Sequence, residues 1–279
     1  MAITNFIPTI WSENLNLQLD NKYVGVNNCN RAYEGDIKEM GSVVKICGIE
    51  NIYVSDYYKN SDMSQPQTLS DTVIEFEIDQ AKYFNFQIDD VDRAQATPKL
   101  MEAAMSTAAA ALARSADSYI FSMCTQANTL LRANTPTSDE LIDIFMKAIT
   151  TLYDNGVSDA SQIVIEVSPQ VAADLIKAKI ELGTNNSEAF ENGQIGTLFG
   201  AKVFVSNNIC TYIEESEVLY NCMVRSKRAI AFAEQLSEIE AYRPEKRFSD
   251  AVKGLHLYGA KVIYPHELVC VEITKPLEY

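Results

Sequence analysis

The longest uninterrupted helical pattern in the chain runs from Thr97 to about Gln126, and it constrains the fold more than any other feature. Thr97 is a suitable N-cap, and Pro98 fits the first helical position. Alanine, the residue with the highest helix propensity, dominates the stretch that follows. At about 1.5 Å per residue the predicted helix is about 45 Å long, so we expect it to connect distant parts of the molecule.

The region before this helix is predicted to be β-structure with an extended excursion. Runs rich in β-branched and aromatic residues occupy 43–46, 52–57 and 73–78, and a polar stretch separates the last two. A two-stranded ribbon buries little surface by itself, so we expect it to rest on another surface. A further alternating strand is predicted over 81–88.

The N-terminal residues are apolar although no core element precedes them. A predicted short helix places Ile10, Trp11, Leu15 and Leu19 on one side. Two interpretations are open. The helix packs on its own domain, or it belongs to an arm that packs on a neighbouring subunit, where tryptophan is enriched.

Helices and strands alternate in the second half of the chain. The sequence TSDE at 137–140 is a capping box, and it begins a helix that Asn155–Gly156 ends. A buried strand is predicted over 162–167. The next helix is predicted to begin at Ser168–Pro169. Its predicted core-facing residues are Val171, Ala172, Leu175, Ile176 and Ile180. A strand followed by a helix indicates an α/β element in this part of the chain.

No set of residues with the spacing of a catalytic or metal site stands out. The chain contains only two histidines, and HELVC at 266–270 lacks the second histidine of a zinc protease motif. Asp89, Asp90 and Asp92 lack the Gly and distal Glu of a calcium loop, so we interpret them as helix caps or dipole partners. We expect no enzymatic activity, metal or cofactor, and we interpret His256 as structural.

The charge of the chain disfavours direct recognition of nucleic acid. Its 38 acidic and 23 basic residues give a net charge of −15, whereas phosphate binding relies on Lys and Arg. Two basic clusters are predicted to meet carboxylates of another subunit: Arg225, Lys227 and Arg228, and Arg243, Lys246 and Arg247.

The six cysteines and the apolar runs point to a cytosolic product without a membrane segment. No CxxC pair occurs, so the cysteines are predicted to be reduced and buried. The N-terminus lacks the basic and apolar regions of a signal peptide, and no apolar run reaches the length of a transmembrane helix.

Four segments, taken in order, resemble the major capsid proteins of tailed double-stranded-DNA bacteriophages: 30–46, 78–96, 195–209 and 229–265. The resemblance covers nearly the whole chain and depends on the order and spacing of the segments. The same fold is shared by encapsulins and the herpesvirus capsid floor. It implies an α+β protein with an N-terminal arm, an extended β loop, a peripheral domain with a long spine helix, and an axial domain.

The resemblance also implies where these parts lie in the chain. The arm corresponds to 1–34, the extended loop to 35–80, the peripheral domain to 81–156 and 223–279 with the spine helix at 97–126, and the axial domain to 157–222.

The function implied by the resemblance is structural. Such proteins self-assemble into hexamers and pentamers of an icosahedral shell, in the host bacterial cytoplasm, and the shell encloses DNA without sequence-specific binding. An acidic inner surface suits that role. The N-terminus lacks a long scaffold-like extension, which implies a separate scaffolding protein or prior cleavage, and portal and decoration proteins are further expected partners. Some relatives join a loop Lys to an Asn, but no Asn follows Asn221 to serve Lys45 or Lys59.

The candidate contacts between subunits lie in all of these parts: Phe6, Ile10, Trp11, Arg31, Tyr53, Tyr57, Lys59, Phe76, Phe190, Arg243, Glu245 and Arg247. Two other functions remain open. One is an encapsulin-type nanocompartment shell, which has the same fold, and the other is a cytosolic α+β enzyme that uses carboxylates.

Overall fold

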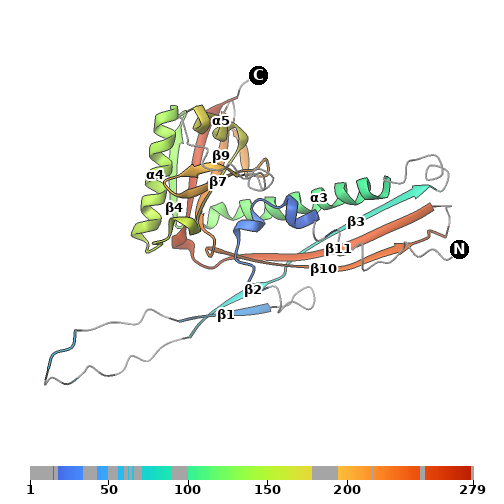
Figure 1. Cartoon of the computed structure of the whole chain (residues 1–279), viewed down its shortest axis with the longest axis horizontal. Coiled ribbons are helices and arrows are strands. Elements are labelled where there is room, and N and C mark those ends of the chain that lie inside the picture. The colour runs from blue at the N-terminus through green and yellow to red at the C-terminus, as the bar shows by residue number, and fades with distance from the viewer. Residues whose placement is uncertain are drawn as a thin grey trace.

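The structure is a computed structural model that describes residues 15, 18–33, 43–49, 56–59, 62, 65, 71–89, 100–177, 194–214, 217–245 and 249–277. These residues form a compact unit, an elongated unit and a two-stranded ribbon (Figure 1). The mixture of helices and sheets confirms the predicted α+β class.

The elongated unit consists of one long helix on a three-stranded antiparallel sheet. Helix α3 (Leu100–Ser122) lies along strands β10 (Ile230–Tyr242), β11 (Ser249–Val262) and β3 (Gln80–Asp89), with β11 in the centre (Figure 1). The long helix is therefore confirmed, and a 3₁₀ turn, η3 (Met123–Gln126), completes it. The predicted cap at Thr97 lies outside the described residues.

The face of α3 that meets the sheet is made of large and small apolar side chains in turn. The buried side chains on this face include Met105, Ala109, Leu112 and Ala116. Alanine at two of these positions lets the helix backbone lie close to the sheet. The same cluster contains sheet residues such as Phe232, Val252 and Tyr258, so the helix and the sheet share one core.

The compact unit is built on a seven-stranded sheet with the order β4-β12-β9-β5-β7-β6, and β8 pairs with β9 beside this path. Its strands are β4 (Thr129–Asn134), β5 (Ile163–Val167), β6 (Gln194–Leu198), β7 (Ala201–Val205), β8 (Thr211–Glu214), β9 (Glu217–Ser226) and β12 (Leu268–Pro276). Helices α4 (Ser138–Asp154) and α5 (Pro169–Lys177) share one hydrophobic core with this sheet.

Local signals in the sequence set the two helices of this unit. The capping box is present. The Thr137 side chain accepts a hydrogen bond from the Glu140 backbone N–H, and the Glu140 carboxylate accepts one from the Thr137 backbone N–H. Gly156, at a φ of 91°, follows the end of α4 as predicted. In α5 one predicted orientation is wrong, because Ile176 is 48% exposed while Val171, Ala172 and Leu175 are buried.

The boundary between the two units differs from the sequence-based division. Residues 129–154 and 268–276 were assigned to the peripheral domain, but β4, α4 and β12 belong to the sheet and core of the compact unit. Strand β12 pairs in parallel with β4 and antiparallel with β9. This pairing brings together segments more than a hundred residues apart, and no local pattern indicates it.

The ribbon is anchored on its own chain. Strands β1 (Val43–Ile49) and β2 (Asp71–Glu77) pair antiparallel, as predicted. Phe76 and Ile78 at its base are fully buried in a small core with residues of β10 and β11. Residues 56–57, predicted to end a strand, are not in a strand, and 51–55 lie outside the described residues.

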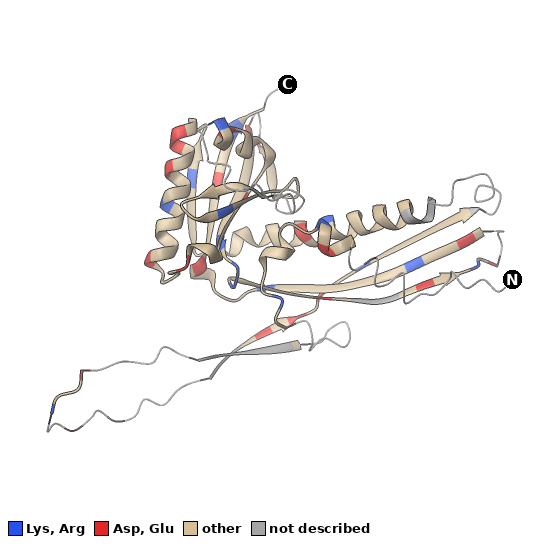
Figure 2. Cartoon of the chain, in the orientation of Figure 1, with Lys and Arg blue, Asp and Glu red and all other residues tan. Residues whose placement is uncertain are grey.

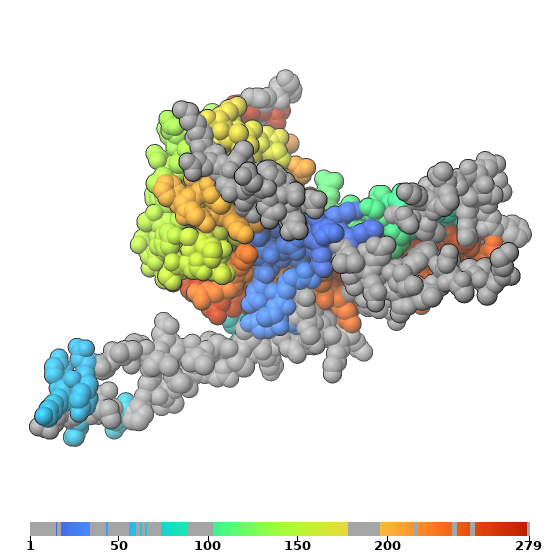
Figure 3. Space-filling model, viewed as in Figure 1, coloured from blue at the N-terminus to red at the C-terminus, as the bar shows by residue number. Residues whose placement is uncertain are grey.

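The described part of the N-terminal region packs on its own chain. Residues 18–22 are helical, and the Leu15 and Leu19 side chains are 1% and 2% exposed in the core of the elongated unit. Figure 3 shows this segment, in blue, between the compact and the elongated units. For Leu15 and Leu19 the structure therefore favours packing within the chain over packing on a neighbour.

Two negative findings concern the described residues. None of their helices is long and apolar enough to cross a membrane. The five cysteines whose state is described, Cys29, Cys124, Cys210, Cys222 and Cys270, are free, as predicted, although Cys210 is only partly buried.

Candidate functional site: the joint that holds the N-terminal segment

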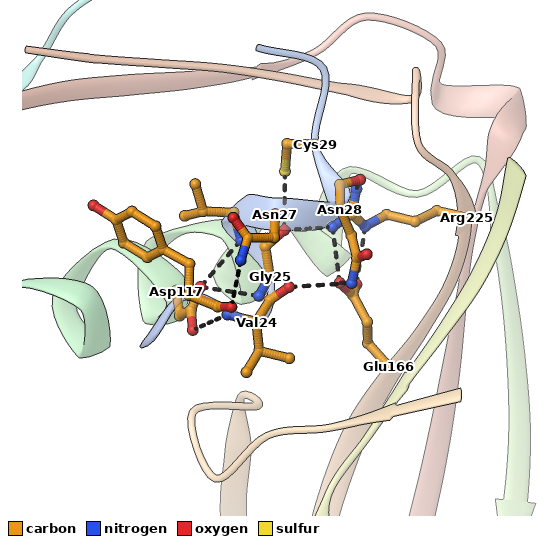
Figure 4. A network of polar contacts seen from close by, with 10 residues as sticks. Val24, Gly25, Asn27, Asn28, Cys29, Asp117, Glu166 and Arg225 are labelled. Atoms are coloured by element: carbon orange, nitrogen blue, oxygen red, sulfur yellow. Dashed lines mark hydrogen bonds and ion pairs between the residues drawn. The ribbon is translucent and has the colours of Figure 1, made fainter. Parts of the chain in front are cut away.

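A buried carboxylate on α3 binds the N-terminal segment, which we define as residues 18–33. Asp117 is 1% exposed, and its oxygens accept hydrogen bonds from three successive backbone N–H groups (Figure 4). The donors are Val24, Gly25 and Val26, at 3.0, 2.9 and 3.1 Å. Three donors in a row fix the direction of this backbone relative to α3.

A buried ion pair binds the same segment to the compact unit. Glu166 of β5 and Arg225 of β9 are both 0% exposed, and the guanidinium donates to both carboxylate oxygens at 2.9 Å (Figure 4). The remaining guanidinium donors reach the carbonyl oxygens of Asn28 at 2.7 Å and Gly25 at 3.0 Å. The Asn28 side chain donates to Glu166 at 3.2 Å. The pair and its hydrogen bonds thus form one network.

Gly25 is required where these groups meet. A Cβ atom there would lie 3.0 Å from the Phe121 ring and 3.3 Å from a carboxylate oxygen of Asp117. A Cβ atom would therefore push the Phe121 ring or the Asp117 carboxylate aside by a few tenths of an ångström, and its absence lets the backbone approach α3 and donate to Asp117.

A second carboxylate, on the sheet of the elongated unit, binds Tyr23 and Arg31 of the N-terminal segment. Glu234 of β10 accepts from the Tyr23 hydroxyl, from Arg31 at 2.7 Å and from His256 at 2.8 Å. These three hydrogen bonds favour the charged carboxylate. Although burial raises the pKa of Glu234, the hydrogen bonds and charges of its partners hold it below the usual value.

We define the joint as the contacts of Asp117, of the Glu166–Arg225 pair and of Glu234 with the N-terminal segment. These contacts connect the segment with both units. Asp117 and Glu234 belong to the elongated unit, and Glu166 and Arg225 belong to the compact unit. Among the described residues no cluster of three or more possible metal ligands occurs. The joint is therefore suited to fixing the relative orientation of the two units.

The joint contains a group that titrates in a mildly acidic range. Burial raises the pKa of Asp117 to about 6, although hydrogen bonds from the segment's backbone lower it. The folded state thus binds this proton more tightly than the unfolded state does. The stabilisation from that proton is complete below the unfolded pKa of about 4 and is lost as the pH rises through about 6.

We therefore expect the effect of Asp117→Asn on stability to depend on pH. The free energy of unfolding of the native subunit, relative to that of the variant, should fall by about 2 kcal/mol as the pH rises from about 4 to about 7. Urea unfolding of unassembled subunits at a series of pH values measures this difference. A difference that does not change with pH would contradict the assignment.

Two of the predicted inter-subunit contact residues form contacts within the chain. Phe76 is fully buried under the ribbon, where β10 and β11 cover it. Arg31 forms ion pairs with Asp20 at 2.8 Å and Glu234 at 2.7 Å. The N-terminal segment and the ribbon base thus pack within the subunit.

The other predicted contact residues are exposed or lie outside the description. Tyr57 is 75% exposed, and Lys59 and Glu245 are also exposed. Arg243 is exposed and has a carboxylate of its own chain, Asp250, at 3.8 Å. The residues outside the described part are Phe6, Ile10, Trp11, Tyr53, Phe190 and Arg247.

Sequence reasoning missed the residues that form the joint. Arg225 and Arg228 were expected to meet carboxylates of another subunit, but they bind Glu166 and Glu267 of the same chain. An isolated Glu within the apolar run of β5 is the one signal that could have indicated a buried pair. Its partner lies 59 residues away, so the pairing itself could not be read from the sequence.

Comparison with solved structures identifies the fold. A chain from Mycobacterium phage Che8 matches with a TM-score of 0.69 and 29% sequence identity, over 89% of this chain and 90% of that chain. The capsid of Ralstonia phage GP4 matches with a TM-score of 0.69 and 12% identity, over 94% of this chain and 91% of that chain. No family model and no curated protein sequence matches.

A virus-like particle from Pyrococcus furiosus is also similar, with a lower TM-score of 0.57 and 11% identity, over 93% of this chain and 96% of that chain. The chain therefore has the fold of phage capsid proteins across nearly its whole length. The resemblance seen in the sequence is confirmed at the level of the fold.

Proposed function

We propose that the chain assembles with copies of itself into hexamers and pentamers of an icosahedral capsid that encloses double-stranded DNA. The observation that carries the proposal is the match to the Che8 chain, which combines 29% identity with coverage of nine-tenths of both chains. The joint supports it, because a shell requires subunits of defined shape. The proposed location is the virion, after assembly in the host bacterial cytoplasm, and the role is structural rather than enzymatic.

The proposal assigns a role to each part of the chain. We propose that the elongated unit is the peripheral domain with α3 as its spine helix, that the compact unit is the axial domain, and that the ribbon is the extended loop. Residues before Leu15 are proposed to act as an arm. A separate scaffolding protein, a portal and decoration proteins are the proposed partners. The net charge of −15 supports an inner surface that encloses DNA without holding it.

Sedimentation and negative-stain electron microscopy of the purified protein test the proposal. Closed particles of uniform size support a shell, whereas a small oligomer would favour the enzyme. The virus-like particle of Pyrococcus furiosus motivates one alternative, a nanocompartment that holds protein. Co-purification of a protein cargo rather than DNA with the particles would favour that alternative.

The ribbon provides a test that separates its base from its tip. Phe76 and Ile78 are buried within the subunit, whereas Tyr57 and Tyr58 are 75% and 67% exposed. We expect amide hydrogen exchange at 76–78 to be slow in both free subunits and shells. Exchange at 56–59 should slow only in shells, when the tip contacts a neighbour. Equal exchange at the tip in both states would contradict a contact there.

A further inference from the structure

Among the described residues, two lysines of the compact unit, Lys202 and Lys227, have no carboxylate partner. Lys202 of β7 pairs with Val164 of β5, which in turn pairs with Arg225 of β9, so these side chains share one face of the sheet. Lys227 follows directly after β9, and its backbone N–H donates to the Gln162 carbonyl oxygen at 2.9 Å. Both lysines are partly buried.

The charges around these lysines are not balanced within the described part of the chain. Glu166 already neutralises Arg225, and Glu267 already neutralises Arg228. Burial and the nearby charges of Lys202 and Arg225 lower the pKa of Lys227. Two ammonium groups that are partly removed from water and lack a counter-ion in the described part of the chain would be stabilised by an anion from outside the subunit.

The complementary charges lie on the opposite side of the same sheet. Ala201 and Val203, the neighbours of Lys202 in β7, belong to the core that the sheet shares with α4, so Lys202 points away from α4. Helix α4 exposes Asp139 and Asp143, which are one turn apart. The helix also exposes Glu140, Lys147 and Asp154, and Figure 2 shows red acidic residues along it.

We propose that Lys202 and Lys227 of one subunit bind Asp139 and Asp143 of a neighbouring copy. A basic pair on one face and an acidic pair on the opposite face suit a head-to-tail contact, and head-to-tail contacts close into rings. This inference rests on the proposed function and names one contact of that assembly. Carboxylates fit better than nucleic-acid phosphates as the partner, because a chain with a net charge of −15 repels DNA overall.

Zero-length cross-linking tests the contact in assembled particles of the full chain. A carbodiimide joins an ammonium group to a carboxylate only where the two touch. We expect treated particles to give a ladder of covalent oligomers in denaturing gels, and mass spectrometry to find Lys202 or Lys227 joined to Asp139 or Asp143. The sheet separates these groups within one subunit, so the linkage reports a contact between subunits. Particles without it would overturn the inference while leaving the proposed function intact.

Charge exchange tests whether the two pairs meet. The variant Lys202→Glu/Lys227→Glu should lose the linkage and yield fewer closed particles, and adding Asp139→Lys/Asp143→Lys should restore the yield. The matched control Lys82→Gln, an exposed lysine on β3, should leave the yield unchanged. Circular dichroism of each variant confirms that the subunit is folded. Failure of the exchanged variant to recover, with all subunits folded, would overturn the inference.

Lysine acetylation distinguishes a carboxylate partner on a neighbouring subunit from a DNA phosphate. In the proposed contact, Lys202 and Lys227 are protected from acetic anhydride equally in empty and in DNA-filled particles. Protection only in DNA-filled particles would show that phosphate is the partner and would overturn the inference. If the native chain forms no particles at all, the proposed function itself fails, which is a different outcome from particles that lack this contact.

Discussion

Replacing Arg225 by methionine is expected to lower the free energy of unfolding of the subunit by about 3–5 kcal/mol. The variant leaves the fully buried Glu166 carboxylate without its cation, and it removes the donors to the carbonyl oxygens of Gly25 and Asn28. A buried charge without a partner accounts for most of this cost. Urea unfolding of unassembled subunits measures it, and slow amide exchange over 24–28 should be lost at the same time.

Two further variants distinguish the contribution of the buried ion pair to stability from that of side-chain packing. The double variant Arg225→Met/Glu166→Leu removes both charges, so it should be less destabilised than the sum of the two single variants. Lys253→Gln breaks an ion pair with Glu240 whose side chains are both about half exposed, at 2.6 Å. It should cost less than about 1 kcal/mol. Additive single variants would contradict the description of the joint as one network.

Replacing Gly259 by alanine is expected to displace the base of the ribbon. A Cβ atom there would lie 2.4 Å from the carbonyl oxygen of Glu77 and 3.0 Å from the Cα atom of Ile78. Both are backbone atoms, so no side-chain rotation can relieve the clash. We expect a loss of about 3 kcal/mol or more in the free energy of unfolding. Residues 71–79 should also become more sensitive to proteolysis in free subunits.

Gly254 on the same strand is the matched control for this prediction. A Cβ atom there would meet the Phe84 ring at 2.5 Å, but that ring is a partly buried side chain on the edge strand β3. Because the ring can move, Gly254→Ala should cost less than Gly259→Ala and should leave the ribbon protected. If Gly254→Ala is the more harmful of the two, the ribbon base does not depend on the close approach at Gly259.

The parts of the fold that the sequence predicts are those set by neighbouring residues. The capping box at 137–140 and the end of α4 at Gly156 are formed by residues within one turn of each other, and both are confirmed. The alternation in TVIEFEID correctly predicts β2, because a strand places alternate side chains on opposite faces. The long helix follows from alanine propensity over many turns.

The parts that the sequence does not predict depend on contacts between distant segments. The observed units differ from the predicted division because β12 joins β4 and β9 through backbone pairing, which leaves no local pattern. The core position of Phe76 could not be predicted because its core partners, Ala231, Ala233 and Leu257, follow 155 to 181 residues later. The joint was missed because Asp117, Glu166 and Arg225 lie on three elements that only the fold brings together.

Electron cryomicroscopy of the particles tests the central claim most directly. The account predicts a closed icosahedral shell whose hexamers and pentamers are rings of subunits with the fold described here. In each subunit, residues 18–33 should lie in that subunit's own joint, bound to Asp117 and to the Glu166–Arg225 pair. Protein that remains a small oligomer under all assembly conditions, or particles in which the N-terminal segment occupies a neighbour's joint, would contradict it.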